Sequence, residues 1–173
     1  QHFKISPQQL EAAITPKTKM FVINSPSNPS GAVYTLDELR ALGEVLLKHP
    51  QILIATDDMY EHILLTGQKF VNIVNACPEL FPQTVVLNGV SKAYSMTGWR
   101  IGYCGGPAAV ITAMENIQSQ STSNPSSISQ VAAETALNGD QSCMNPMIAA
   151  FKERNLYVTE QLNEFNGVCC LAS

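Results

Sequence analysis

The sequence lacks several features that would assign it to a broad functional class. No run of 18 or more apolar residues occurs, so neither a transmembrane helix nor a membrane partner is expected. Basic residues number 10 against 14 acidic ones, and a net charge of −4 argues against a nucleic-acid partner. Charged residues make up 14% of the chain and hydrophobic residues 45%, a balance that predicts a globular domain rather than a disordered segment.

The cysteines are not spaced for metal binding. The five cysteines form no C-x-x-C pair, so no zinc site or other metal site is expected. Their odd number fits reduced thiols, which indicates a cytoplasmic location. Cys77, Cys104 and Cys143 are predicted to be small buried side chains.

Two familiar catalytic patterns are also missing. No S-x-x-K or G-x-S-x-G motif is present, so Ser91 and Lys92 are not favoured as the dyad of a serine hydrolase. The stretch 102–106 is glycine-rich but lacks the G-x-G-x-x-G spacing of a dinucleotide-binding loop.

Short apolar runs alternate with segments of helical periodicity. A parallel sheet buried on both faces produces such runs, and helices cover it, so we predict a three-layer α/β/α sandwich with a mostly parallel sheet. Capping boxes at Ser6 and Thr35 mark two helix starts. The predicted strands are 20–23, 52–55, 84–87 and 101–104. The later predicted helices are 36–48, 107–118, 125–137 and 145–165.

Polar residues follow three of the predicted strands. Asn28 follows the first strand, Asp57 the second and Lys92 the third. Ligands bind beyond the carboxyl ends of parallel strands, so we expect these side chains to meet at one edge of the sheet.

Three motifs contain these residues. Residues 28–31 read Asn-Pro-Ser-Gly, Asp57 and Tyr60 form an Asp-x-x-Tyr pattern, and residues 91–102 run from Ser-Lys to Gly-Trp-Arg-Ile-Gly. In this order and spacing they resemble the signatures of class I aminotransferases, the aspartate aminotransferase family of fold type I pyridoxal-phosphate enzymes. The resemblance covers essentially the whole chain, with Ser30 where the family has threonine.

The resemblance implies pyridoxal 5′-phosphate as cofactor, with Lys92 as the catalytic lysine that binds the cofactor's aldehyde. By itself, Lys92 also fits a solvated surface lysine. Asp57 is implied as the carboxylate that keeps the ring nitrogen protonated, although a helix cap or turn would use an aspartate equally well. Asp58 is the rival, and only one of the two can face the ring because successive strand side chains point to opposite faces.

The remaining cofactor contacts are implied in the same way. Asn28 and Tyr60 would bind the phenolic oxygen, and Ser91 and Arg100 the phosphate. Each has a structural alternative: turn chemistry for Asn28, packing for Tyr60, a strand-end cap for Ser91 and a surface ion pair for Arg100.

The resemblance also implies segments outside this sequence. Residues 1–167 would form the central part of the cofactor-binding large domain, and 168–173 the start of a segment leading to a C-terminal small domain. The family has an upstream phosphate turn, a stacking aromatic, a downstream arginine for the substrate's α-carboxylate, and a homodimer. One branch of the family has a second arginine near a Ser-Asn-Pro segment; residues 123–125 have that tripeptide without an arginine nearby.

The implied reaction is transfer of an amino group between an amino acid, aspartate-like or aromatic, and a 2-oxo acid. Alternatives on the same fold are a β-lyase and a cyclopropane-carboxylate-type synthase. A further alternative is that the 173-residue chain is inactive by itself.

Overall fold

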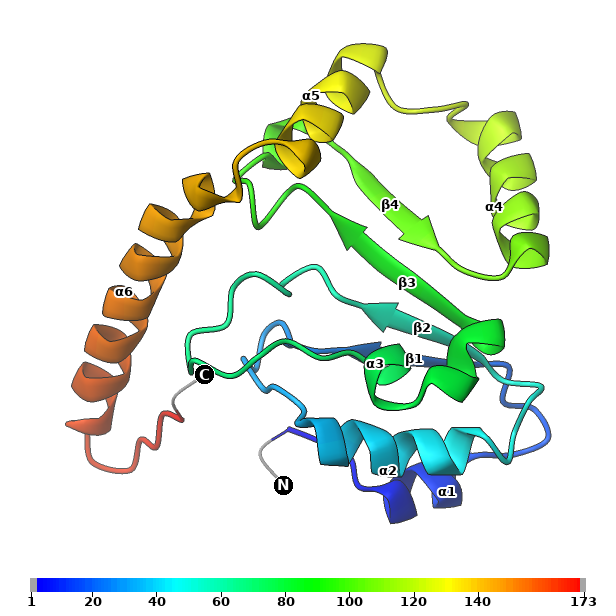
Figure 1. Ribbon diagram of the computed structural model, residues 1–173. Helices are drawn as coiled ribbons and strands as arrows, with labels where there is room; N and C mark the ends of the chain where they lie inside the picture. Colours follow the sequence, from blue (N-terminus) through cyan, green and yellow to red (C-terminus); the bar gives the residue numbers. More distant parts are fainter. Residues whose placement is uncertain (1–2, 172–173) are drawn as a thin grey trace.

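The structure is a computed structural model of the chain, and it describes residues 3–171. Helices and strands alternate along most of it (Figure 1). The strands are β1 (Met20–Asn24), β2 (Leu53–Asp57), β3 (Thr84–Gly89) and β4 (Gly102–Gly105). The α-helices are α1 (Pro7–Ala13), α2 (Leu36–Leu46), α3 (Ile73–Ala76), α4 (Ala108–Ser121), α5 (Ser127–Asn138) and α6 (Asn145–Asn163). The 3₁₀ helices are η1 (Pro78–Gln83), η2 (Thr97–Trp99) and η3 (Gln141–Met144).

The four strands form one sheet in the order β1-β2-β3-β4. The first three strands are parallel and β4 is antiparallel to β3, which confirms the predicted mostly parallel sheet. In register, Asn24 pairs with Asp57, and Asp57 pairs with Leu87. The carboxyl ends of the three parallel strands therefore lie at one edge of the sheet.

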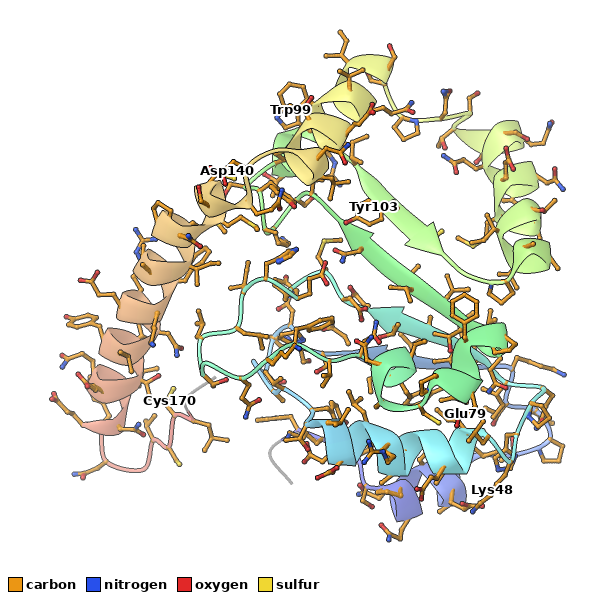
Figure 2. The ribbon with its side chains drawn as sticks, viewed as in Figure 1. Lys48, Glu79, Trp99, Tyr103, Asp140 and Cys170 are labelled. Carbon is orange, nitrogen blue, oxygen red and sulfur yellow. The ribbon has the colours of Figure 1, made fainter. Side chains whose placement is uncertain are left out.

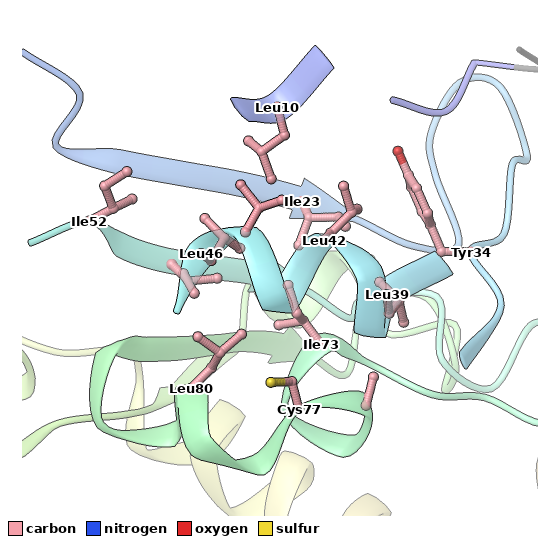
Figure 3. Close-up of a cluster of buried hydrophobic side chains, with 13 residues drawn as sticks. Leu10, Ile23, Tyr34, Leu39, Leu42, Leu46, Ile52, Ile73, Cys77 and Leu80 are labelled. Atoms are coloured by element: carbon pink, nitrogen blue, oxygen red, sulfur yellow. The ribbon is translucent and has the colours of Figure 1, made fainter. Parts of the chain in front are cut away.

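The main hydrophobic core lies between one face of the sheet and α1, α2, α3 and η1 (Figure 3). Thr35 begins α2 with the predicted capping box, and the apolar face of α2 packs on Ile23 of β1 and Ile73 of α3. On the opposite face of β1, Val22 remains 62% exposed. Among the described residues, the helical layer thus lies mainly on the face that contains Ile23.

A second, smaller core holds the loop between β3 and β4. Val90 and Ile101 at the two ends of this loop pack against Ala133 of α5. Trp99 of η2 lies beside α5 in Figure 2. In addition, the Tyr94 hydroxyl donates to Gln141 Oε1 of η3 at 2.6 Å. The loop that contains Lys92 is therefore held by the α5–η3 segment as well as by the sheet.

Two predictions from the sequence need correction. Strand β2 extends to Asp57, so this residue is the last residue of the strand and does not follow it. Cys143, which was predicted to be buried, is exposed because it lies in η3 between α5 and α6; Cys77 is buried and Cys104 is partly buried. Across residues 3–171, no group of three or more His, Cys, Asp or Glu side chains is arranged to hold a metal ion.

None of the helices described is both long enough and apolar enough to cross a bilayer.

Candidate active site

Lys92, Tyr60 and Asn28 lie together at the carboxyl edge of the sheet. The Lys92 Nζ atom is 6.0 Å from the centroid of the Tyr60 ring, within the range of a cation–π contact. The Asn28 amide Nδ2 donates to the Tyr60 hydroxyl at 3.3 Å. Because that hydroxyl oxygen acts as acceptor, its own proton is free to be donated to a ligand.

Lys92 and Tyr60 line a cavity of about 630 Å³ that is wide enough for a small cofactor and substrate. Its polar lining near Lys92 includes the hydroxyls of Ser91, Ser95 and Thr97. The remaining lining residues come from the loop after β2 and from α6: Ile63, Leu65, Phe151, Arg154, Asn155 and Val158. The contribution of α6 was not predicted, because its local sequence has no motif and only the tertiary fold brings it here.

Asp57 and Asp58 diverge at the end of β2. Asp57 is partly buried, and its Oδ1 accepts a hydrogen bond from the backbone N–H of Met59 at 3.2 Å. Asp58 is 2% exposed and accepts hydrogen bonds from Thr56 Oγ1 and Asn72 Nδ2, both at 2.7 Å. Burial raises the pKa of the Asp58 carboxyl to about 6. Asp58 is thus fully engaged inside the protein, whereas Asp57 keeps acceptor capacity at the strand end.

Asn24 connects the Asn28 loop to the end of β2. Its Nδ2 donates to the carbonyl of Asp57 at 3.0 Å, and its Oδ1 accepts from the backbone N–H of Asn28 at 2.8 Å. One side chain therefore fixes the relative position of two predicted site residues. This role was not predicted from the sequence. The signal that could have indicated it is the position of Asn24, a polar residue at the end of an otherwise apolar strand.

The two predicted phosphate ligands differ in their positions. Ser91 lines the cavity beside Lys92, but Arg100 is not among the lining residues. The Arg100 guanidinium donates from Nη1 to the carbonyl of Thr97 at 2.8 Å, and its backbone is left-handed with φ of 55°. Among residues 3–171 Arg100 forms no ion pair, so the surface ion pair considered above is not observed. Arg100 is connected to the cavity through Thr97.

At the carboxyl edge of this mostly parallel sheet, a lysine lies beside a tyrosine that is hydrogen-bonded to an asparagine. In α/β domains this edge is where small molecules bind. The chain belongs to the aminotransferase class I and II family, whose model matches residues 1–173. The predicted family resemblance is therefore confirmed.

Named relatives agree with this assignment. The chain is 76% identical over 173 residues to the aspartate/prephenate aminotransferase of Nitrosomonas europaea, covering all of this chain and 44% of that protein. It is 51% identical to the aspartate aminotransferase of Geobacillus stearothermophilus, covering 98% of this chain and 43% of that protein. The chain thus spans about two fifths of the length of these relatives.

A solved structure matches the fold closely. The aspartate aminotransferase from Rhizobium meliloti superposes with a TM-score of 0.96 at 50% sequence identity, covering 98% of this chain and 42% of that chain. This match confirms the predicted α/β fold with a mostly parallel sheet.

Proposed function

We propose that the full-length protein is a pyridoxal-phosphate-dependent aminotransferase that transfers an amino group between an amino acid and a 2-oxo acid. One observation supports this most strongly: Lys92 lies next to the Tyr60 ring in a cavity at the carboxyl edge of the sheet. Asn28 donates a hydrogen bond to the hydroxyl of the same tyrosine. Family membership supports the same reaction class. The names of the relatives favour aspartate as amino donor and a prephenate-like oxo acid as acceptor.

The residues present offer several of the groups that pyridoxal phosphate requires. Lys92, which lines the cavity, offers the amine for the aldehyde. Asp57 is not among the lining residues, and we assign its carboxylate at the strand end to the ring nitrogen. The free proton of the Tyr60 hydroxyl and the amide of Asn28 suit the phenolic oxygen. Ser91 supplies a hydroxyl, and Arg100 the guanidinium that we assign to the phosphate.

Each residue has a distinct task in the proposed reaction. When bound, the cofactor would supply an electron sink for the substrate's α-carbon. Lys92 Nζ would accept the proton from that carbon as general base and would give it back as general acid. Asp57 would hold the proton on the ring nitrogen, and Tyr60 and Asn28 would bind the phenolic oxygen. Ile63 and Phe151 add apolar side chains to the lining of the cavity.

These relatives are named aminotransferases, which favours amino transfer over the β-lyase and synthase alternatives.

We also propose that the full-length protein is a homodimer in the cytoplasm. Exposed apolar side chains on α4 and α5, such as Ile117 and Ile128, support a surface that further protein covers.

A direct assay tests the function. Purified full-length protein is incubated with pyridoxal phosphate, aspartate and 2-oxoglutarate or prephenate, and the amino-acid product is quantified. We expect turnover with wild type and none above background with Lys92→Ala, while Lys152→Ala on the exposed side of α6 retains activity. Lyase products without transfer of the amino group would contradict the proposal.

A further inference from the structure

Asp58 is a buried carboxylate for which the proposed reaction has no use. It follows Asp57 directly but turns to the interior, where both of its oxygens are occupied. Oδ1 accepts from the Thr56 hydroxyl and Oδ2 accepts from the Asn72 amide, each at 2.7 Å. A buried charge is retained only with such partners, because removal from water otherwise costs too much.

The partners of Asp58 are themselves fixed. Asn72 is the N-cap of α3, and its Oδ1 accepts from the backbone N–H of Asn75 at 2.9 Å, which leaves its Nδ2 for Asp58. The Asp58 backbone N–H donates to Leu87 of β3, and its carbonyl accepts from Glu61, both at 2.9 Å. Asp58 therefore joins β2, β3 and the start of α3 at the turn that contains Tyr60.

This arrangement opposes stability above about pH 6. Desolvation is the largest cause that raises the pKa of Asp58; the bonds from Asn72 and Thr56 lower the pKa, and the charges of Glu61 and Asp57 raise it. The net result is a pKa raised from 3.8 to about 6. The contacts from α3 and β3 come from neutral groups, Asn72 and Leu87. A carboxyl whose pKa is raised on folding stabilises the fold at low pH, and this contribution is lost as the pH rises through the folded-state pKa. At neutral pH the ionised group is thus a net cost.

A neutral asparagine would fit the same place. Its amide could accept from Asn72 and donate to Thr56, whose hydroxyl works in either direction. The negative charge is consequently the one property of Asp58 that the local fold does not need.

We propose that Asp58 is a positioning residue whose buried negative charge acts through Asp57. The charge adds negative potential behind the Asp57 carboxylate and so strengthens its hold on the ring-nitrogen proton of the bound cofactor. This inference rests on the proposed function, since it assumes that Asp57 faces the pyridoxal-phosphate ring. The two carboxylates thus have different roles: Asp57 contacts the ring nitrogen of the cofactor, and Asp58 strengthens that contact through its charge.

The first experiment needs no cofactor. Urea unfolding of the full-length apoprotein is measured at pH 5 and pH 8 for wild type, Asp58→Asn and the control Asp37→Asn, an exposed carboxylate on α2. Between these pH values the folding constant of wild type should fall about tenfold relative to that of Asp58→Asn, while Asp37→Asn should follow wild type. If Asp58→Asn is less stable than wild type at both pH values, Asp58 has a purely structural role and the proposal is overturned.

The second experiment observes the ring nitrogen. The full-length protein is loaded with pyridoxal phosphate labelled with ¹⁵N in its ring, and the nitrogen shift is followed against pH. Asp58→Asn should lower the pH at which the ring nitrogen loses its proton by at least half a unit, and Asp37→Asn should not. Thr56→Val removes one donor to the carboxylate and raises the pKa of Asp58, so it should reproduce the effect of Asp58→Asn at low pH only.

The outcomes separate this inference from the proposed function. If wild type binds the label at Lys92 and Asp58→Asn titrates identically, the role of Asp58 is wrong and the function stands. If wild type does not bind pyridoxal phosphate at Lys92, both are wrong. A variant that does not fold would be replaced by Thr56→Val, in which Asp58 is unchanged.

Discussion

Asp57 and Asp58 show how two adjacent residues of the same type acquire different properties. The strand directs them to opposite faces, so one carboxylate lies at the edge of the sheet and the other under α3. The burial of Asp58 raises its pKa to about 6, and the same burial keeps its two hydrogen-bonded oxygens away from a ligand. We therefore assign the cofactor contact to Asp57.

The first prediction follows from this assignment. Asp57→Asn removes the anion that holds the ring-nitrogen proton, so turnover of the full-length protein should fall roughly 10- to 100-fold, the range of one charge-assisted hydrogen bond. Asp58→Asn should have a clearly smaller effect on steady-state turnover. Equal losses, or a larger loss at position 58, would place the cofactor on the other face of the strand end.

Tyr60 gives a second prediction at this scale. Tyr60→Phe removes the hydroxyl that Asn28 orients but keeps the ring next to Lys92. Pyridoxal-phosphate affinity should fall roughly 2- to 10-fold, as for a single neutral hydrogen bond. Tyr157→Phe, an exposed tyrosine on α6, is the control. Unchanged affinity in Tyr60→Phe would assign the tyrosine to packing alone.

At the scale of secondary-structure elements, the packing of α2 on the segment after α3 depends on Gly43. A Cβ atom at this position would lie 2.8 Å from the Cys77 Cβ and 3.3 Å from a methyl of Leu80. Glycine is helix-destabilising, so its presence in α2 is explained by this close approach and not by helix propensity.

Gly43→Ala should therefore destabilise the protein by about 1–2 kcal/mol, because the overpacking cost exceeds the gain in helix propensity. Urea unfolding at constant pH measures the change. Gly105→Ala in β4 is the matched control, since a Cβ there meets nothing within 4 Å. If Gly43→Ala is as stable as wild type, the contact between α2 and Cys77 is looser than described.

The elements also show which features a sequence reveals. Ser6 and Thr35 begin their helices as predicted, because a capping box is formed by residues three apart. The end of β2 was placed too early, because Thr56 and Asp57 are polar yet continue the ladder to β3. Cys143 was predicted wrongly, because its exposure depends on how α5 and α6 are connected.

The same distinction applies to the candidate site. Lys92, Tyr60 and Asn28 lie in local motifs, and the parallel sheet places those motifs at one edge, so their proximity followed from the pattern. Phe151 and Arg154 reach the cavity from α6, about 60 residues beyond Lys92. No local sequence pattern predicts that residues so far apart along the chain lie close in space, and only the folded structure shows it.

At the scale of the whole molecule, the chain covers about two fifths of the length of its relatives. The well-packed core around α2 predicts that residues 20–167 form a compact α/β unit. The cavity near Lys92 has only part of the contacts that a phosphate and a ring require. The isolated chain should consequently bind pyridoxal phosphate weakly and catalyse no transamination.

Titration of the isolated chain with pyridoxal phosphate, followed by absorbance, checks this prediction against the full-length protein. Each missing charge-assisted contact removes about 1.5–3 kcal/mol, so two or three of them lower the affinity by about 10²-fold or more. Tight binding, or measurable amino transfer by the 173-residue chain alone, would show that this region contains a complete site.

The most direct measurement of the central claim is the site of covalent attachment. Full-length protein is incubated with pyridoxal phosphate, reduced with borohydride, digested and mapped by mass spectrometry. We expect the label on the peptide that contains Lys92, at one group per chain, and its loss in Lys92→Ala with the fold intact by circular dichroism. Label recovered mainly on Lys48 or Lys152, or undiminished in Lys92→Ala, would contradict the assignment of this site.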